Sequence, residues 1–339
     1  MKKRTPRFLP IPVTILTGYL GSGKTTLLNK ILHEKHGEKI AVIENEFGEA
    51  GIDNELLINS DEQIVTMNNG CICCTVRGDL VRILGDLSEK RKRGALEFNR
   101  VVIETTGLAD PAPVAQTFFV ENEISQDYVL DAIITLVDAV HAQNQLTDHH
   151  EAQEQVGFAD HILLSKTDLV TEDALLSLKK RLKALNSRAP ISTVKFGEMD
   201  IKKILDIRSF SLDNILKIEP DFLSDVTHEH DDSISSFVFR SEKPMLIDKI
   251  ELFLNRMISL FGKDMLRYKG VLYIKNETSR ITLQGVHMIM QSSSGKVWKK
   301  NEVKESVLVF IGRNLPKDVF MIGLKDCLYQ DTSRQGYHV

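Results

Sequence analysis

The chain has 339 residues, of which 42% are hydrophobic and 27% charged, and its formal net charge is −4. This composition is typical of a globular protein with enough apolar residues for two domains. The slightly acidic charge argues against a general nucleic-acid-binding protein, which usually carries a basic surface. No uninterrupted apolar stretch approaches the roughly 18 residues that a membrane-spanning helix needs, so we expect no membrane partner.

The cysteines and the first residues both indicate a cytoplasmic protein. Three of the four cysteines lie together between residues 71 and 74, whereas the cysteines of a secreted disulfide framework are spread along the chain. The first residues, MKKRTPRFLPIPVTILTGYL, are basic and then apolar, like a signal peptide. However, Pro10 and Pro12 interrupt the apolar run, and no cleavage site of small residues follows it. We therefore expect a cytoplasmic chain with reduced thiols.

From residue 10 to about residue 205, strand-like apolar runs alternate with helical segments. Most of the runs are continuously apolar, which is typical of parallel strands buried on both faces. The alternation predicts a doubly wound, mostly parallel α/β domain over residues 10–205. Its expected strands are Val13–Thr17, Ile40–Ile43, Ile64–Met67, Val101–Thr105, Ala132–Val137, Ile162–Ser165 and Ile191–Val194. Its expected helices are Lys24–Glu34, Val76–Lys90, Val114–Phe119, His141–Gln155 and Ala174–Asn186.

The pattern changes beyond residue 205. Residues 206–232 are predicted to be a linker, because their second half is polar and acidic. Over residues 233–330, strands follow one another without helices between them, which predicts a smaller α+β domain with an antiparallel sheet. Its expected strands are Ile234–Phe239, Val271–Ile274, Ile281–Val286 and Ser306–Ile311, and its expected helices are Leu246–Phe261 and Lys317–Leu324.

Residues 18–25, GYLGSGKT, match the phosphate-loop pattern G-x-x-x-x-G-K-[ST] between a predicted strand and a predicted helix. Glycines in such a loop let backbone N–H groups approach phosphate oxygens, and the helix N-terminus adds partial positive charge. We expect Lys24 to bridge the β- and γ-phosphates and Thr25 to hold Mg²⁺. The first domain is therefore predicted to be a P-loop NTPase, with a nucleotide-binding set of Gly18, Gly21, Ser22, Gly23, Lys24, Thr25 and Thr26.

An acid at the end of a later strand predicts the second part of the nucleotide site. The segment VVIETTG, residues 101–107, is an apolar strand that ends in Glu104 and is followed by a glycine. A carboxylate at this position can reach Mg²⁺ and help to place the attacking water, so we predict Glu104 as a magnesium ligand and, with Lys24, as a catalytic residue. Gly107 lets its backbone N–H approach the γ-phosphate.

The third part of the predicted site selects the base. The segment ILLSKTDL ends a strand with Ser165, Lys166, Thr167 and Asp168. The Asp168 carboxylate can accept hydrogen bonds from both N1–H and the 2-amino group of guanine, and adenine offers no equivalent pair. Lys166 can lay its aliphatic stem along the base plane. Such motifs usually begin with Asn or Thr, so Ser165 is a departure that affects a supporting hydrogen bond.

The clustered thiols lie in NGCICCTVRGDL, between the phosphate loop and Glu104, where nucleotide-dependent switches usually occur. Three sulfurs so close together suit a borderline cation such as Zn²⁺, with one tetrahedral position left for another group. Upstream carboxylates could complete this metal site or contact Mg²⁺ and water. The candidate metal ligands are Cys71, Cys73, Cys74, Glu44, Glu46 and Glu49.

Other interpretations of these side chains remain open. Cys71 and Cys74 form a C-x-x-C pair, which can be a redox site, or the cysteines can be buried and inert. The carboxylates can be solvated. His228 and His230 lie in the acidic linker, as weak metal ligands or as solvated side chains, and Cys327 is a packed or surface thiol.

The segments GYLGSGKTT, ENEFGE, GCICC, ETTGLADPAP and SKTD, in this order, resemble the CobW-type metallochaperone GTPases, from about residue 10 to about residue 316. LRYKG, QGV and VFIG look like the second domain of that family. The resemblance implies slow GTP hydrolysis coupled to delivery of a transition metal, usually Zn²⁺ and sometimes Co²⁺ or Fe²⁺, to a client metalloprotein. It implies that the three clustered cysteines bind the metal with the three glutamates close by, and that the chain forms a nucleotide- or metal-linked homodimer. Many relatives carry a long histidine run where this chain has only two histidines.

The predicted function is that of a GTP-hydrolysing metal chaperone or insertase. No arginine finger is evident in cis, so turnover by the chain alone should be slow. One alternative is a small-molecule kinase with a structural zinc, which would need an acceptor pocket and would not need the guanine motif. A second alternative is a nucleotide-linked metal sensor or storage protein, which turnover that changes with metal would exclude.

Overall fold

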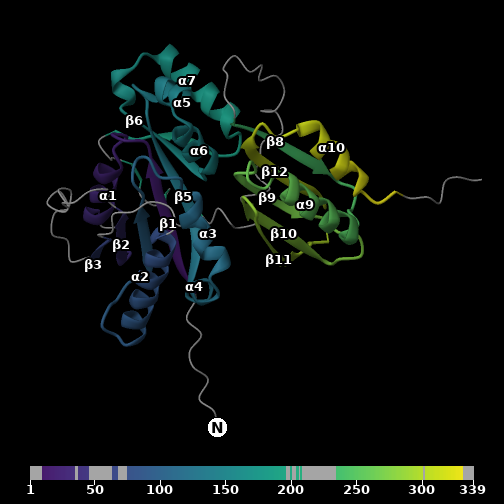
Figure 1. The fold of residues 1–339 in the computed structure, drawn as a ribbon, viewed down its shortest axis with the longest axis horizontal. Coiled ribbons are helices and arrows are strands. Elements are labelled where there is room, and N and C mark those ends of the chain that lie inside the picture. Colours follow the sequence, from purple (N-terminus) through teal and green to yellow (C-terminus); the bar gives the residue numbers. More distant parts are fainter. Residues whose placement is uncertain are drawn as a thin grey trace, which may run out of the picture. The chain divides into compact units, whose positions relative to one another are not determined.

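The computed structural model describes residues 10–34, 37–45, 63–67, 75–195, 199–200, 204–205, 207, 234–300 and 302–330. The chain divides into two compact units (Figure 1). The described residues up to Ile207 belong to the first unit, and those from Ile234 onward belong to the second. None of the helices in these ranges has both the length and the apolar character needed to cross a lipid bilayer.

The first unit is built on a seven-stranded sheet in the order β3-β2-β4-β1-β5-β6-β7, in which every neighbouring pair is parallel. β1, β4, β5 and β6 are buried along almost their whole length, which is why their sequences are continuously apolar. This is the predicted doubly wound α/β fold. The strands are β1 (Ile11–Gly18), β2 (Ile40–Asn45), β3 (Gln63–Met67), β4 (Arg100–Glu104), β5 (Tyr128–Asp138), β6 (His161–Ser165) and β7 (Ile191–Thr193).

The helices of the first unit follow the prediction, with two differences. The helix expected over residues 141–155 is interrupted at His149, whose backbone is extended at φ −132° and ψ 117°. The polar run Asp148–Glu151 offers no apolar side chain to bury there. A short helix, α4, precedes β5 and was not predicted. The helices are α1 (Lys24–His33), α2 (Thr75–Lys92), α3 (Ala112–Val120), α4 (Asn122–Asp127), α5 (Ala142–Asp148), α6 (His150–Phe158) and α7 (Glu172–Leu185).

The second unit is a five-stranded antiparallel sheet in the order β11-β10-β9-β12-β8, which confirms the predicted α+β class. Aromatic side chains from the strands and from α10 form much of its core, with Phe310 at 5.0 Å and Phe237 at 5.4 Å from the Phe320 ring. The elements are β8 (Ile234–Ser241), α9 (Ile247–Phe261), β9 (Arg267–Leu272), β10 (Ser279–Val286), β11 (Ile289–Val297), β12 (Ser306–Arg313) and α10 (Lys317–Asp326).

Two strands of the second unit differ from the sequence prediction. The edge strand β11 was missed, because its exposed segment QSSSGK has no alternation of apolar and polar residues. β9 begins at Arg267, four residues before the predicted start at Val271. Arg267 and Lys269 interrupt the apolar run, and their pairing with β10 and β12 makes them part of the strand.

Candidate nucleotide-binding site

The phosphate loop lies between β1 and α1, at the carboxyl edge of the parallel sheet. Gly18 and Gly23 have φ values of 144° and 99°, a region that favours glycine. A Cβ on Gly18 would lie 2.3 Å from the carbonyl oxygen of Leu136 on β5, so no larger residue fits. α1 begins at Lys24, and its first N–H groups are therefore available to an anion in the loop.

Lys24 and Thr25, at the start of α1, lie beside Glu104 at the end of β4. The Lys24 ammonium is buried and donates to the carbonyl oxygen of Gly18 at 2.9 Å. Burial lowers the pKa of Lys24, and the nearby Glu104 carboxylate opposes this shift. The Thr25 hydroxyl donates to Glu104 Oε1 at 3.3 Å. A hydroxyl and a carboxylate in contact are oxygen ligands of the kind that Mg²⁺ prefers, so this pair fits the metal.

Glu44 adds a second carboxylate to the same edge of the sheet. In the parallel pairing of β2 with β4, Glu44 is the direct partner of Glu104. The Glu44 side chain is 4% exposed. Glu44, one of the three glutamates predicted to lie at the zinc site, therefore lies next to Thr25 and Glu104, the candidate ligands of Mg²⁺. Glu46 and Glu49 lie outside the described residues.

The loop after β4 is packed directly on the phosphate loop. The Thr105 hydroxyl donates to the Thr17 hydroxyl at 2.8 Å and fixes the loop to β1. A Cβ on Gly107 would lie 2.7 Å from the backbone nitrogen of Leu20, so the two loops could not approach this closely with any residue but glycine. Gly107 therefore lies directly against the phosphate loop, and its contact with the γ-phosphate stays a prediction.

A cavity of about 410 Å³ connects the phosphate loop to the predicted base-recognition segment. The Ser165 hydroxyl donates to the carbonyl oxygen of Ser22 at 2.7 Å, so the predicted base-recognition segment is attached to the phosphate loop. Ser165, the departure from the usual motif, thus supplies a direct bond. The cavity is lined by Ser22, Gly23, Thr26, Leu27, Leu136, Ser165, Lys166, Asp168, Leu169 and Val194.

Asp138 is a site residue that the sequence analysis missed. It ends β5, is 1% exposed, and its Oδ2 accepts a hydrogen bond from Lys166 Nζ at 2.7 Å. Its Oδ1 accepts one from the backbone N–H of Val140 at 2.9 Å. This carboxylate holds Lys166, whose backbone is left-handed at φ 55°, beside the cavity. An acid at the end of an apolar strand, as in Glu104, was the signal that could have identified Asp138.

The predicted thiolate site, Cys71, Cys73 and Cys74, lies outside the described residues, as do His228 and His230. In the part of the chain that the structure describes, no three His, Cys, Asp or Glu side chains are grouped so that they could hold a metal ion. Cys327 is buried near the end of α10, where burial raises the pKa of its thiol to about 11. Of the two alternatives, a packed thiol or a surface thiol, the structure shows the packed one.

The parallel sheet, the phosphate loop and the adjoining cavity define a P-loop nucleotide-binding protein. Residues 12–193 match the family model described as the CobW/HypB/UreG nucleotide-binding domain, and residues 234–328 match the cobalamin synthesis protein CobW C-terminal domain. The chain belongs to the CobW family.

Relatives resemble the chain over most of its length. The zinc chaperone YjiA of Escherichia coli is 43% identical over 310 residues, which cover 91% of this chain and 96% of the relative. The zinc-regulated GTPase metalloprotein activator 1 of Saccharomyces cerevisiae is 31% identical over 355 residues, covering 91% and 81%. A crystal structure of Zn(II)-bound YjiA GTPase from E. coli matches with a TM-score of 0.75 and 36% identity, over 95% of this chain and 100% of that chain.

Proposed function

We propose that this chain is a GTPase that binds zinc and couples its nucleotide state to delivery of the metal to a client metalloprotein. The observation that carries the proposal is the cavity that joins the phosphate loop to Asp168, a carboxylate suited to guanine. The names of the relatives, a zinc chaperone and a zinc-regulated GTPase, support the zinc and the GTP in this proposal.

Each side chain of the nucleotide site has a proposed role. Lys24, with the backbone of Gly18, Gly21, Ser22, Gly23 and Thr26, binds the phosphates, while Lys166, Thr167 and Asp168 bind the base. Thr25 and Glu104 would hold Mg²⁺, which neutralises phosphate charge when it is bound. Glu104 also orients the attacking water, and the Gly107 N–H contacts the γ-phosphate.

For zinc, we propose Cys71, Cys73 and Cys74 as ligands, with Glu44, Glu46 and Glu49 close by. Three thiolates bind zinc tightly, and a fourth position is left for exchange. We propose that residues 10–205 form the GTPase domain, 206–232 a linker and 233–330 the second domain, and that the protein acts in the cytoplasm, where thiols stay reduced.

We also propose a nucleotide-linked homodimer. Leu20 in the phosphate loop and Leu108 in the loop after β4 are 55% and 53% exposed. Gly107, which precedes Leu108, is packed against Leu20, so the two exposed leucines belong to loops that adjoin at the proposed nucleotide site. Exposed apolar groups of this kind are typical of protein contacts.

The test is a phosphate-release assay with purified protein, GTP or ATP, and Mg²⁺, with and without zinc. We expect slow release from GTP, little from ATP, and a rate that changes with zinc. A protein that transfers phosphate only to an added small-molecule acceptor is a kinase, and turnover that is indifferent to zinc would contradict the coupling. A variant with Cys71, Cys73 and Cys74 replaced by Ala should keep GTP binding and lose tight zinc binding.

A further inference from the structure

Gln155, on α6, has a buried side chain that hydrogen-bonds the loop after β4. Its side chain is 1% exposed, and Nε2 donates to the carbonyl oxygens of Gly107 and Ala109, both at 3.1 Å. Both carbonyls belong to the loop after β4, which touches the phosphate loop at Leu20. One buried amide group therefore fixes two peptide groups of the loop that carries the proposed γ-phosphate contact.

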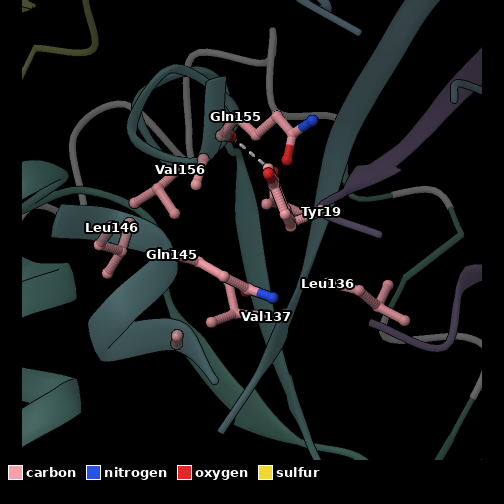
Figure 2. A pocket seen from close by; sticks show the side chains of 10 residues that line it. Tyr19, Leu136, Val137, Gln145, Leu146, Gln155 and Val156 are labelled. Atoms are coloured by element: carbon pink, nitrogen blue, oxygen red, sulfur yellow. Dashed lines mark hydrogen bonds between the residues drawn. The ribbon is translucent and has the colours of Figure 1, made fainter. Parts of the chain in front are cut away.

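The helix that carries Gln155 is itself attached to the sheet and to the phosphate loop. Thr135 on β5 donates its hydroxyl to the Gln155 carbonyl oxygen at 2.7 Å. His149, just before α6, stacks on the ring of Tyr19 in the phosphate loop, with centroids 5.0 Å apart. Tyr19 and Gln155 line the same pocket, which at about 10 Å³ is too small for a ligand (Figure 2). α6 and the residue before it thus contact both the phosphate loop and the loop after β4.

We propose that Gln155 is a positioning residue that holds Gly107 ready for the γ-phosphate and so makes the site favour GTP over GDP. This inference rests on the proposed GTPase function. GDP has no γ-phosphate, so it does not use the Gly107 N–H. A loop that is fixed before binding loses less conformational entropy when the nucleotide arrives. Only GTP contacts this loop through its γ-phosphate, so only GTP affinity is increased.

The test compares the full-length protein with Gln155→Met, which has a side chain of similar length but no donor. Fluorescent GDP and a fluorescent non-hydrolysable GTP analogue are titrated with Mg²⁺ present. We expect the affinity for the GTP analogue to fall by about fivefold or more while that for GDP stays within about twofold, since coupling of this kind is commonly worth at least that factor. The kcat of GTP hydrolysis should fall as well.

Gln153→Met is the matched control. Gln153 lies on the same helix, is 3% exposed, and donates to the carbonyl oxygen of Leu146 on α5 at 2.7 Å. It should leave the ratio of the two affinities unchanged. The quantity compared is the affinity for the GTP analogue divided by the affinity for GDP. If Gln155→Met leaves this ratio unchanged, raises it, or lowers it no more than Gln153→Met does, Gln155 only supports the fold and the inference is wrong.

Two further measurements separate the possible failures. Retained GDP binding shows that the first unit of a variant is folded. If Gln155→Met does not bind GDP, the same ratio is measured in Gln155→Asn, which keeps the amide but is one methylene too short to reach both carbonyls. A parent protein that neither binds nor hydrolyses GTP would contradict the proposed function itself, whereas a GTPase with equal ratios in all variants would contradict only the role of Gln155.

Discussion

In the proposed function, Asp168 is the residue that selects the base bound in the cavity. It lines the cavity with Lys166. Both residues come after Ser165 in the chain, and the Ser165 hydroxyl is hydrogen-bonded to the phosphate loop. In Asp168→Asn an amide N–H₂ faces the donors of guanine. We expect GTP affinity to fall about tenfold or more, because an unpaired buried polar group costs ~1–3 kcal/mol. Xanthine nucleotide, with an acceptor at position 2, should gain relative affinity.

Competition titrations with GTP and xanthosine triphosphate measure this change. Asp173→Asn is a suitable control, because Asp173 is an exposed carboxylate on α7 outside the cavity. Equal GTP affinity in Asp168→Asn and the parent protein would show that this carboxylate does not bind the base.

Glu104 is the residue whose loss should separate turnover from binding. In Glu104→Gln the amide oxygen can still accept the hydrogen bond from Thr25, but the negative charge proposed to act on Mg²⁺ and the attacking water is gone. We expect kcat for GTP to fall about a hundredfold or more, because a misplaced attacking group can cost about that factor, with a much smaller change in affinity. Single-turnover kinetics and nucleotide titration measure the two effects. Parental kcat in the variant would remove Glu104 from the catalytic set.

Among the elements, the edge pair β6 and β7 contains a pH-sensitive contact. His161 on β6 is 7% exposed, and its Nε2 lies 2.9 Å from the Ser192 hydroxyl on β7. Burial lowers the pKa of His161 to about 4. In the unfolded chain the pKa is about 6.5, so between these values only the unfolded state binds the proton. The neutral, buried His161 therefore makes its full contribution to the free energy of unfolding above pH 6.5. This contribution is lost progressively as the pH drops toward 4.

This contact predicts a difference between the parent and His161→Gln. The glutamine can still bond Ser192 but does not titrate, so the variant should lack this part of the pH dependence. The loss in the parent amounts to at most about 3 kcal/mol of unfolding free energy. Urea unfolding at pH 7 and pH 4.5 of both proteins measures it, and the acidic groups common to both cancel in the comparison. Parallel pH dependences would mean that His161 is not buried in neutral form.

At the scale of the whole molecule, the proposed function requires that metal and nucleotide affect each other. The proposed thiolates stand in the sequence between the phosphate loop and Glu104. If they belong to a switch, nucleotide should change zinc affinity and zinc should change nucleotide affinity by the same factor, because linkage is reciprocal. Couplings of this kind are commonly about five- to 150-fold. Replacement of both Cys73 and Cys74 by Ala should abolish the coupling and leave GTP binding largely intact.

A chromophoric zinc chelator in competition, under reducing conditions, measures zinc affinity with GTP analogue, with GDP and without nucleotide. Zinc affinity that is the same in all three states, or that survives the loss of the thiols, would contradict the metal-switch proposal. A redox or structural role for GCICC would then be the better explanation of the clustered cysteines.

The sequence by itself determined the class of the fold and the identity of most candidate nucleotide-binding residues. The phosphate-loop pattern is contiguous, and the flanking strand and helix are evident from local hydrophobicity, so Lys24 and Thr25 could be recognised without a structure. The continuously apolar strands indicated a parallel sheet for the same reason. Where the local pattern was weak, as in the polar edge strand β11 and at the helix break at His149, the prediction was wrong.

Only the tertiary structure decided which distant residues meet. Thr25 and Glu104 are 79 positions apart, and they touch because β4 pairs with β1 in a sheet whose order differs from the order of the chain. The same is true of Asp138 with Lys166 and of Gln155 with Gly107. The residues that flank Gln155 in the sequence do not indicate which distant groups its side chain contacts. Its two hydrogen bonds depend on the packing of α6 against a loop that begins at a different strand, and strand order and register, rather than local pattern, determine that packing.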